Sequence, residues 1–259
     1  MANFEFDGEK YRQASKHQKE WGDKLIAELN LQGDEQVLDL GCGDGTLTQK
    51  IASLLPNGSV IGVDASMGMI QAAQQLQQPN LSFVHMDIND IAYENRFDVI
   101  FSNAALHWIK NHKLLFENCL RALKAGGKIA WNFAADGTCT TFNETVKEVM
   151  NVPLYKGYFE GFEWPWFMPS EDEYRILLEN SGLSNFELRY ENVDRYFANS
   201  DEMIKWIDQP CIVPFLKVLP DDKKEGFRNL VVEMMKDRTK QPDGTCFETF
   251  RRINVKAIK

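Results

Sequence analysis

Short apolar runs recur along residues 34–134, and segments with apolar residues at helical spacing separate them. Within residues 46–55, leucine and isoleucine recur every three or four positions, which predicts an amphipathic helix directly after the first run. Strands that alternate with helices in this way are typical of a parallel sheet with helices on both faces. The expected elements are one or two helices over 9–30 and strands over 37–40, 58–64, 81–84, 97–101 and 128–131.

This rhythm breaks after residue 134. Residues 135–169 show no clear strand–helix unit. Ser170 precedes three acidic residues, which is the pattern of a helix N-terminus. The elements expected beyond it are a helix over 170–180, a strand over 186–193, helices over 200–206 and 220–237, and a closing strand over 246–258.

A glycine-rich loop follows the first apolar run directly. Residues 37–45 read Val-Leu-Asp-Leu-Gly-Cys-Gly-Asp-Gly. Glycine permits a tight turn and lets a ligand lie against bare backbone, so the loop predicts a nucleotide site, with a plain turn as the alternative. A dinucleotide fingerprint counted from Gly41 requires glycine at position 46, where this chain has threonine.

Polar residues end the following strands as well. The second strand ends at Asp64, the third leads into Asp87, and the fourth leads into Asn103. In nucleotide sites of this architecture, the acid after the second strand accepts hydrogen bonds from ribose hydroxyls. The spacing Asp-x-Gly-x-Gly-x-Gly from Asp39, with five strands in this order, resembles the class I S-adenosylmethionine-dependent methyltransferases.

The resemblance implies a fold, a cofactor and a binding site. The fold is α/β, with a doubly wound, mostly parallel seven-stranded sheet, the Rossmann-like methyltransferase fold, and helical cap insertions. Residues 1–134 would form N-terminal helices and the S-adenosylmethionine-binding core, and residues 135–259 the remainder of the sheet with a helical and aromatic substrate cap. The implied cofactor-binding residues are Asp39, Gly41, Cys42, Gly43, Asp64, Ala65, Ser66, Met67, Asp87, Ile88, Asn103 and Ala104.

Two groups within this family resemble the chain further. Residues 103–109 and 206–258 are similar to trans-aconitate methyltransferases, and residues 11–18 and 106–109 look like juvenile hormone acid methyltransferases. Both groups methylate carboxylates, so the resemblance implies O-methylation of a small-molecule acid. The candidate catalytic residues are Trp108, His107, Gln18 and Tyr11, and the candidate partners of a carboxylate are Arg12, Arg195, Arg251 and Arg252.

A carboxylate acceptor simplifies the chemistry. A carboxylic acid has a pKa of about 4 and is already ionised at neutral pH, so no general base is required. The protein would contribute positioning and a dry pocket. Residues 155–167 contain seven aromatic side chains. We expect this aromatic segment to form a mobile cap, with the core of a subdomain as the alternative.

Composition limits the classes of ligand that the chain is expected to bind and the compartment in which it is expected to act. The formal net charge is −9 and no run of basic residues occurs, which argues against a nucleic acid as the main ligand. No apolar stretch is long enough to cross a membrane, and no signal peptide is visible. Five scattered cysteines without a Cys-x-x-Cys motif favour a reduced cytoplasmic protein. We expect no metal site, and a monomer or weak dimer.

Other functions stay open at this point. Methylation of a carbon, a nitrogen or an acid bound to a carrier protein is the alternative among methyltransferases. A non-catalytic module that binds the cofactor is disfavoured by the intact loop with Asp39 and Asp64. A nicotinamide dehydrogenase is disfavoured by Thr46 and by the missing second half of a dinucleotide fold.

Overall fold

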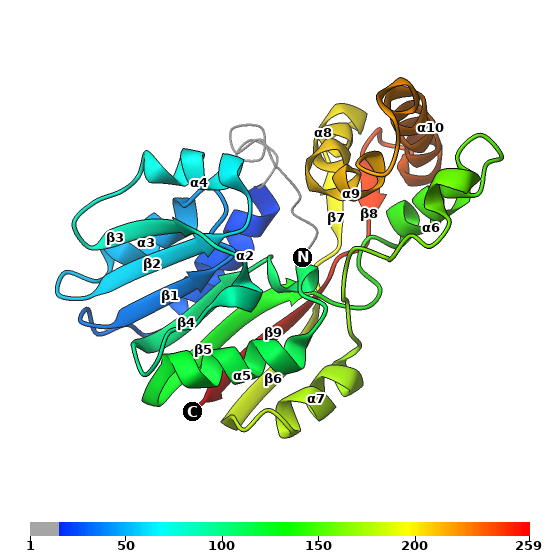
Figure 1. The fold of residues 1–259 in the computed structure, drawn as a ribbon. Coiled ribbons are helices and arrows are strands. Elements are labelled where there is room, and N and C mark those ends of the chain that lie inside the picture. Colours follow the sequence, from blue (N-terminus) through cyan, green and yellow to red (C-terminus); the bar gives the residue numbers. More distant parts are fainter. Residues whose placement is uncertain (1–15) are drawn as a thin grey trace. The chain divides into compact units, whose positions relative to one another are not determined.

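A seven-stranded sheet organises much of the chain in the computed structural model, which describes residues 16–259 (Figure 1). Its strands are β1 (Gln36–Leu40), β2 (Ser59–Asp64), β3 (Leu81–His85), β4 (Phe97–Asn103), β5 (Leu123–Ala134), β6 (Ser184–Asn192) and β9 (Arg251–Ile258). They lie in the order β3-β2-β1-β4-β5-β9-β6. Strands β1 to β5 pair in parallel, and β9 runs antiparallel to β5. The predicted mostly parallel seven-stranded sheet is confirmed.

Helices cover both faces of this sheet (Figure 1). They are α2 (Lys16–Ala27), α3 (Thr46–Ser53), α4 (Met67–Gln74), α5 (His112–Ala122) and α7 (Glu171–Glu179). Ile26 of α2, Ile51 of α3 and Ile70 of α4 share one buried core on the first face. Phe116 of α5 and Tyr174 of α7 belong to a second core on the opposite face. The sheet is therefore doubly wound, as predicted.

The strand order places a ligand crevice at one edge of the sheet. From β1 the chain adds β2 and β3 on one side, and then β4 and β5 on the other. In open parallel sheets such a reversal leaves a crevice at the carboxyl ends of the strands, where ligands bind. Leu40, Asp64 and Asn103 end their strands at this edge.

Local sequence signals set several helix ends. Ser170 Oγ accepts a hydrogen bond from the Glu173 N–H (3.2 Å), and Glu173 Oε2 accepts one from the Ser170 N–H (2.9 Å). This reciprocal capping box fixes the start of α7. Asn111 caps α5 in a similar manner, because its Oδ1 accepts from the Leu114 N–H.

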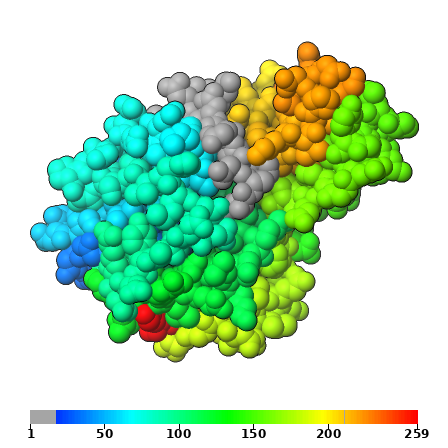
Figure 2. Space-filling model, in the orientation of Figure 1, coloured from blue at the N-terminus to red at the C-terminus, as the bar shows by residue number. Residues whose placement is uncertain are grey.

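The described chain divides into two compact units. The first unit contains the described residues up to Asp136, together with Trp166–Glu191 and Arg252–Lys259, and it carries the sheet. The second unit contains Gly137–Pro165 and Asn192–Arg251. The chain end, red in Figure 2, lies at the surface of the first unit, where Lys259 Nζ donates to the Leu123 carbonyl.

The second unit is a helical body with its own aromatic core. It contains α6 (Thr140–Met150), α8 (Ser200–Trp206), α9 (Val213–Leu216), α10 (Asp221–Thr239) and a two-stranded sheet of β7 (Arg195–Phe197) and β8 (Cys246–Glu248). Tyr155 and Phe159 pack against Phe227 of α10, and Phe162 and Trp164 pack against Phe215 of α9. These rings of the aromatic segment contribute to that core, and a role of the segment as a cap stays a prediction.

One helix of the C-terminal half was not predicted, and one expectation there was wrong. Residues 135–169 include helix α6, whose apolar stripe of Phe142, Val146 and Val149 lies within a segment rich in β-branched threonine. Residues 246–258 form two strands in different sheets, because the Phe250 N–H donates to Asp194 Oδ1 and not to a neighbouring strand. Burial alternates straight through this break, so the sequence pattern resembles one strand.

Within residues 16–259, no helix combines the length and the apolar character that a membrane crossing requires.

Candidate active site

The glycine loop connects β1 to α3 and is held against β2. The N–H groups of Gly41 and Cys42 both donate to the Val63 carbonyl, at 2.8 and 3.0 Å. The Gly43 N–H donates to Asp64 Oδ2 (2.9 Å). The backbone of the loop is therefore fixed at the carboxyl edge of the sheet before any ligand arrives.

The three glycines of this loop meet different surroundings. All three have positive φ, at 72° for Gly41, 54° for Gly43 and 78° for Gly45. A Cβ added at Gly41 would lie 2.2 Å from the Ala105 Cβ, and one at Gly45 would lie 2.7 Å from the Phe83 ring. A Cβ at Gly43 would meet nothing within 4 Å. Gly41 and Gly45 allow close packing, whereas Gly43 borders open space that a ligand can occupy.

Asp39, near the end of β1, and Cys42, within the loop, are both buried. Asp39 is 2% exposed and accepts a hydrogen bond from Thr48 Oγ1 (2.7 Å). Burial raises the pKa of Asp39 to about 7, against the hydrogen bond from Thr48, which favours the ionised form. Burial also raises the pKa of the Cys42 thiol well above its ordinary value. Cys42 is thus an unreactive small residue in the loop.

Asp64 joins the loop to the start of α4. Its Oδ2 accepts from Gly43, and its Oδ1 accepts from the Ser66 N–H (2.9 Å). Ser66 is buried and caps α4 through a bond from the Met69 N–H. The Ala65 carbonyl bonds to His85 Nε2 (3.0 Å), and the Met67 side chain is exposed. Asp64 therefore shapes the crevice.

Asp87 begins a short turn after β3. Its Oδ1 accepts from both nitrogens of Asn89, at 2.8 and 2.9 Å. The next side chain, Ile88, is buried in the core on the α5 side of the sheet. Asp87 itself is half-buried at the same edge as Asp64.

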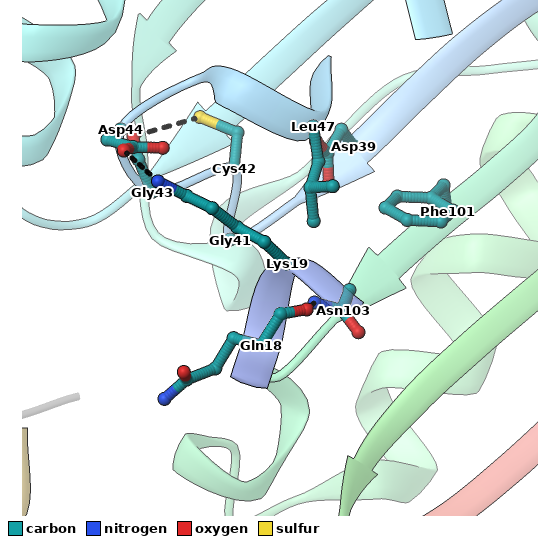
Figure 3. A pocket seen from close by; sticks show the side chains of 10 residues that line it. All are labelled: Gln18, Lys19, Asp39, Gly41, Cys42, Gly43, Asp44, Leu47, Phe101 and Asn103. Atoms are coloured by element: carbon teal, nitrogen blue, oxygen red, sulfur yellow. Dashed lines mark hydrogen bonds and ion pairs between the residues drawn. The ribbon is translucent and has the colours of Figure 1, made fainter. Parts of the chain in front are cut away.

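A pocket opens between this loop and α2 (Figure 3). Lys19 reaches from α2 toward the loop and pairs with Asp44 (3.5 Å). Helix α2 lies very close to α3 here, since a Cβ added at Gly22 would lie 2.2 Å from Leu47 Cδ1 at the start of α3. The ten lining residues are Gln18, Lys19, Asp39, Gly41, Cys42, Gly43, Asp44, Leu47, Phe101 and Asn103.

Hydrogen-bond acceptors dominate the polar lining of this pocket. Asn103 is 8% exposed, and its Nδ2 donates to the Gln18 backbone carbonyl (2.8 Å). Asn103 Oδ1 and Gln18 Oε1 are buried and accept no hydrogen bond from the described residues. Buried acceptors without a donor are costly, and together with Asp39 and Asp44 they suit a ligand that carries a positive charge.

The turn after β4 lies against the glycine loop. Ala104 has a φ of 57°, unusual for a residue with a Cβ, and its N–H donates to the Asn132 carbonyl of β5 (2.7 Å). Ala105 is the residue that packs on Gly41. The turn continues as a single 3₁₀ turn, Leu106–Trp108, which brings His107 and Trp108 to the carboxyl edge of the sheet.

His107 is an uncharged, buried imidazole. It is 9% exposed, and its Nδ1 has no hydrogen-bond partner among the described residues. Burial lowers the pKa of His107 to about 3, and the positive charge of Arg252 contributes to this shift. A group with so low a pKa is a weak base at neutral pH.

His112 and Tyr174 support this turn from the α5 side. His112 Nε2 lies 3.0 Å from the Leu106 carbonyl, so this nitrogen carries the proton and donates. His112 Nδ1 then accepts from the Tyr174 hydroxyl (2.9 Å). Burial lowers the pKa of His112 to about 4, which keeps the ring neutral in this arrangement.

The last two rings of the aromatic segment, Trp166 and Phe167, are fastened to the same turn. The Phe167 N–H donates to the His107 carbonyl (2.7 Å), and Lys110 Nζ donates to the Trp166 carbonyl (3.3 Å). The rings of Trp108 and Trp166 meet edge to face, with centroids 5.7 Å apart. Trp108 is half-buried, so this aromatic pair borders the turn.

The predicted site residues lie in different parts of the structure. The predicted cofactor-binding residues gather along the ends of β1 to β4, and Gln18 of α2 joins the pocket beside them. Tyr11 and Arg12 lie outside the described residues. Arg251 pairs with Asp194 in the second unit, which also holds Arg195, and Arg252 is buried in the first unit.

The comparisons with known proteins agree with this geometry. A family model described as a methyltransferase domain matches residues 37–127. An uncharacterized methyltransferase of Schizosaccharomyces pombe is 32% identical over 247 residues, which cover 91% of this chain and 90% of the relative. A trans-aconitate 2-methyltransferase of Deinococcus radiodurans is 29% identical over 225 residues and 84% of each chain.

A solved structure shares the fold. Haemonchus contortus phosphoethanolamine N-methyltransferase 2, in complex with S-adenosyl-L-methionine, superposes with a TM-score of 0.61 at 19% identity, over 97% of this chain and 56% of that one. The crevice, the glycine loop and these relatives define an enzyme that binds a nucleoside cofactor. The chain belongs to the class I S-adenosylmethionine-dependent methyltransferases, and S-adenosylmethionine is its cofactor.

Several residues of this site were not predicted from the sequence. Lys19, Gly22 and Asp44 line or shape the pocket, and Asn132 accepts from Ala104. Asp44 stands inside the glycine motif, so its position alone was a usable signal. Lys19 and Gly22 belong to a helix that only the tertiary fold brings to the loop.

Proposed function

We propose that this enzyme transfers the methyl group to the carboxylate of a small-molecule acid and forms a methyl ester. The observation that carries the proposal is the state of His107. It is the titratable side chain of the turn Asn103–Trp108, and its pKa of about 3 makes it a poor acceptor of protons. An alcohol, phenol or ammonium acceptor must lose a proton, whereas a carboxylic acid is ionised above about pH 5.

The residues of the first unit fit the cofactor. We infer that S-adenosylmethionine binds along Gly41–Gly45, where Gly43 leaves open space. Asp64 would hold the ribose and Asp87 the adenine amine, while Ala65, Ser66, Met67 and Ile88 would flank the nucleoside. The acceptors Asp39, Asn103 Oδ1 and Gln18 Oε1 suit the ammonium of the amino-acid end, and Cys42 and Ala104 border the same crevice.

When bound, the cofactor supplies an electrophilic methyl group on a sulfonium. The chain's own residues would orient the acceptor and exclude water. Trp108 and Trp166 offer an aromatic wall beside the turn, and neutral His107 offers a hydrogen bond without a charge. Reaction between an anion and a cation reduces charge, so a dry wall favours this step over the same step in water. Gln18 and Tyr11 are proposed to complete this side of the site.

The relatives support an acid acceptor. One relative is named for trans-aconitate, which is a carboxylic acid. The aromatic wall and the acceptor-rich pocket differ from a site built for three carboxylates, so we infer that the acceptor is a more apolar acid. The aromatic segment 155–167 is proposed to contribute to acceptor binding as a cap.

A methyl-transfer screen tests the proposal. The purified enzyme is offered labelled cofactor and a panel of apolar monocarboxylic acids and tricarboxylates, each beside its primary amide. We expect methylated products from apolar acids, not from the amides, and hydrolysis of these products in mild base. Products that survive mild base would contradict the proposal, because N-methyl and C-methyl compounds are not hydrolysed under these conditions.

A further inference from the structure

Arg252 and Asn132 form a buried clamp at the carboxyl edge of the sheet. Both side chains are 3% exposed. Arg252 Nε donates to Asn132 Oδ1 (2.9 Å), and its Nη2 donates to the same oxygen and to the Asn132 backbone carbonyl (3.3 Å). One guanidinium thus holds both oxygens of a single residue, which is a use of the planar fork that lysine cannot reproduce.

The backbone carbonyl in this clamp has a second partner. It accepts the N–H of Ala104, the residue with a φ of 57° at the end of β4 (2.7 Å). A non-glycine residue in this conformation persists only where its surroundings fix it. Arg252 fixes the acceptor of that bond, so it acts through Asn132 on the first residue of the turn that carries His107 and Trp108.

Neighbouring contacts keep the clamp in register. Asn103, Asn132 and Asn254 stand opposite one another on β4, β5 and β9, and Asn132 Nδ2 donates to Asn254 Oδ1 (2.6 Å). The Arg252 guanidinium lies over the Trp21 ring of α2, 4.3 Å from its centroid. Burial of the Arg252 cation and of the neighbouring amides is unfavourable unless hydrogen bonds compensate. Such a cluster therefore indicates a role in the site more than general packing of the core.

We propose that Arg252 is a positioning residue for methyl transfer. Its hydrogen bonds to Asn132 hold the turn Ala104–Trp108 in place against the cofactor loop. The proposal rests on the proposed role of this turn in acceptor binding. The electrostatics agree with it, because Arg252 and His112 are the charged and titratable groups that act on His107, and both favour its neutral form. Arg252 therefore adds to the effect of burial, which is the main cause of the neutral state of His107.

Amide hydrogen exchange of Ala104, measured by NMR without acceptor, tests the clamp directly. Arg252→Lys keeps the charge and removes the fork. The matched control is Arg189→Lys, since Arg189 of β6 pairs with Glu28, which follows α2 and lies away from the turn. We expect Ala104 exchange to accelerate by about tenfold or more in Arg252→Lys, the effect of losing a hydrogen bond to a charged group, and to stay unchanged in the control.

Activity gives a second readout. With the best acceptor from the screen, Arg252→Lys should lower kcat by about tenfold, while the cofactor Kd stays within about twofold of wild type, because the loop contacts are intact. Unchanged Ala104 exchange would overturn the proposal. Equal acceleration across all amides of β4 would also overturn it, because that result marks a general stabilising role.

The variant Asn132→Ala and the exchange measurement without acceptor make the test of the clamp independent of the fate of Arg252→Lys and of the acid screen. If Arg252→Lys does not fold, Asn132→Ala removes the clamped Oδ1 and leaves the carbonyl that Ala104 uses, and the same selective acceleration is expected. Because exchange is measured without acceptor, its result is independent of the acid screen. Selective acceleration together with base-stable products would support the clamp and contradict the carboxylate proposal.

Discussion

At the residue scale, the loop Gly41–Gly45 shows how one motif combines structural and ligand-facing positions. Ala105 lies where a side chain of residue 41 would be, and the Phe83 ring lies where one of residue 45 would be, so both glycines serve packing. Gly43 borders open space, although its sequence context looks the same. The spacing of the motif and of the acids Asp39 and Asp64 was predictable from the sequence, because such signals are local. The different surroundings of the glycines were not, because their neighbours lie 28 to 64 residues away in the chain.

Replacement of Gly43 by valine tests the ligand-facing position. We expect Gly43→Val to fold and to lose cofactor binding, because the new side chain fills the space beside the loop. The matched control is Gly126→Val, since Gly126 also has positive φ and open surroundings but lies in the irregular first part of β5, between Leu123 and Lys128. Calorimetry should show wild-type affinity in the control. Undiminished affinity in folded Gly43→Val would contradict this assignment.

At the element scale, the turn after β4 is held from both faces of the sheet. Arg252 and Asn132 hold it from the α2 side, and His112 and Tyr174 hold it from the α5 side. The sequence predicted the strands and the polar ends of β1 to β4, because the spacing of apolar residues and the turn residues mark these elements locally. It did not predict these supports, because α7 and β9 reach the turn only through tertiary structure. Helix α6 was missed for a local reason, its threonine-rich start.

Removal of the Tyr174 hydroxyl tests the support on the α5 side. Tyr174→Phe keeps the ring in the core but leaves His112 Nδ1 without its donor. We expect a loss of about 1–2 kcal/mol in the free energy of unfolding, measured by denaturant titration at pH 7. Tyr158→Phe serves as the control, since Tyr158 is 41% exposed, and a change within about 0.5 kcal/mol is expected there. Equal stability of the two variants would mean that the bond to His112 contributes nothing.

At the scale of the whole molecule, each of the two units is built from separate stretches of the chain. The division predicted at residue 134 follows the end of the strand–helix rhythm, and residues 166–191 and 252–259 then return to the first unit. They add β6 and β9 to the sheet, and they also bring Trp166, Phe167 and Arg252 to the turn after β4. The proposed acceptor side is therefore built from distant parts of the sequence. This explains why the cofactor side was predictable in more detail.

The central claim is that methyl transfer proceeds without a titrating base. The most direct test is the pH dependence of kcat between about pH 6 and 8, for wild type, His107→Ala and Trp108→Ala. Saturating cofactor is used, because burial raises the pKa of Asp39 to about 7 and Asp39 is one of the residues proposed to bind the cofactor. We expect a nearly flat profile for wild type, a small loss in His107→Ala and a larger loss in Trp108→Ala. A wild-type rate that rises tenfold per pH unit through neutrality, and loses this dependence in His107→Ala, would contradict the claim.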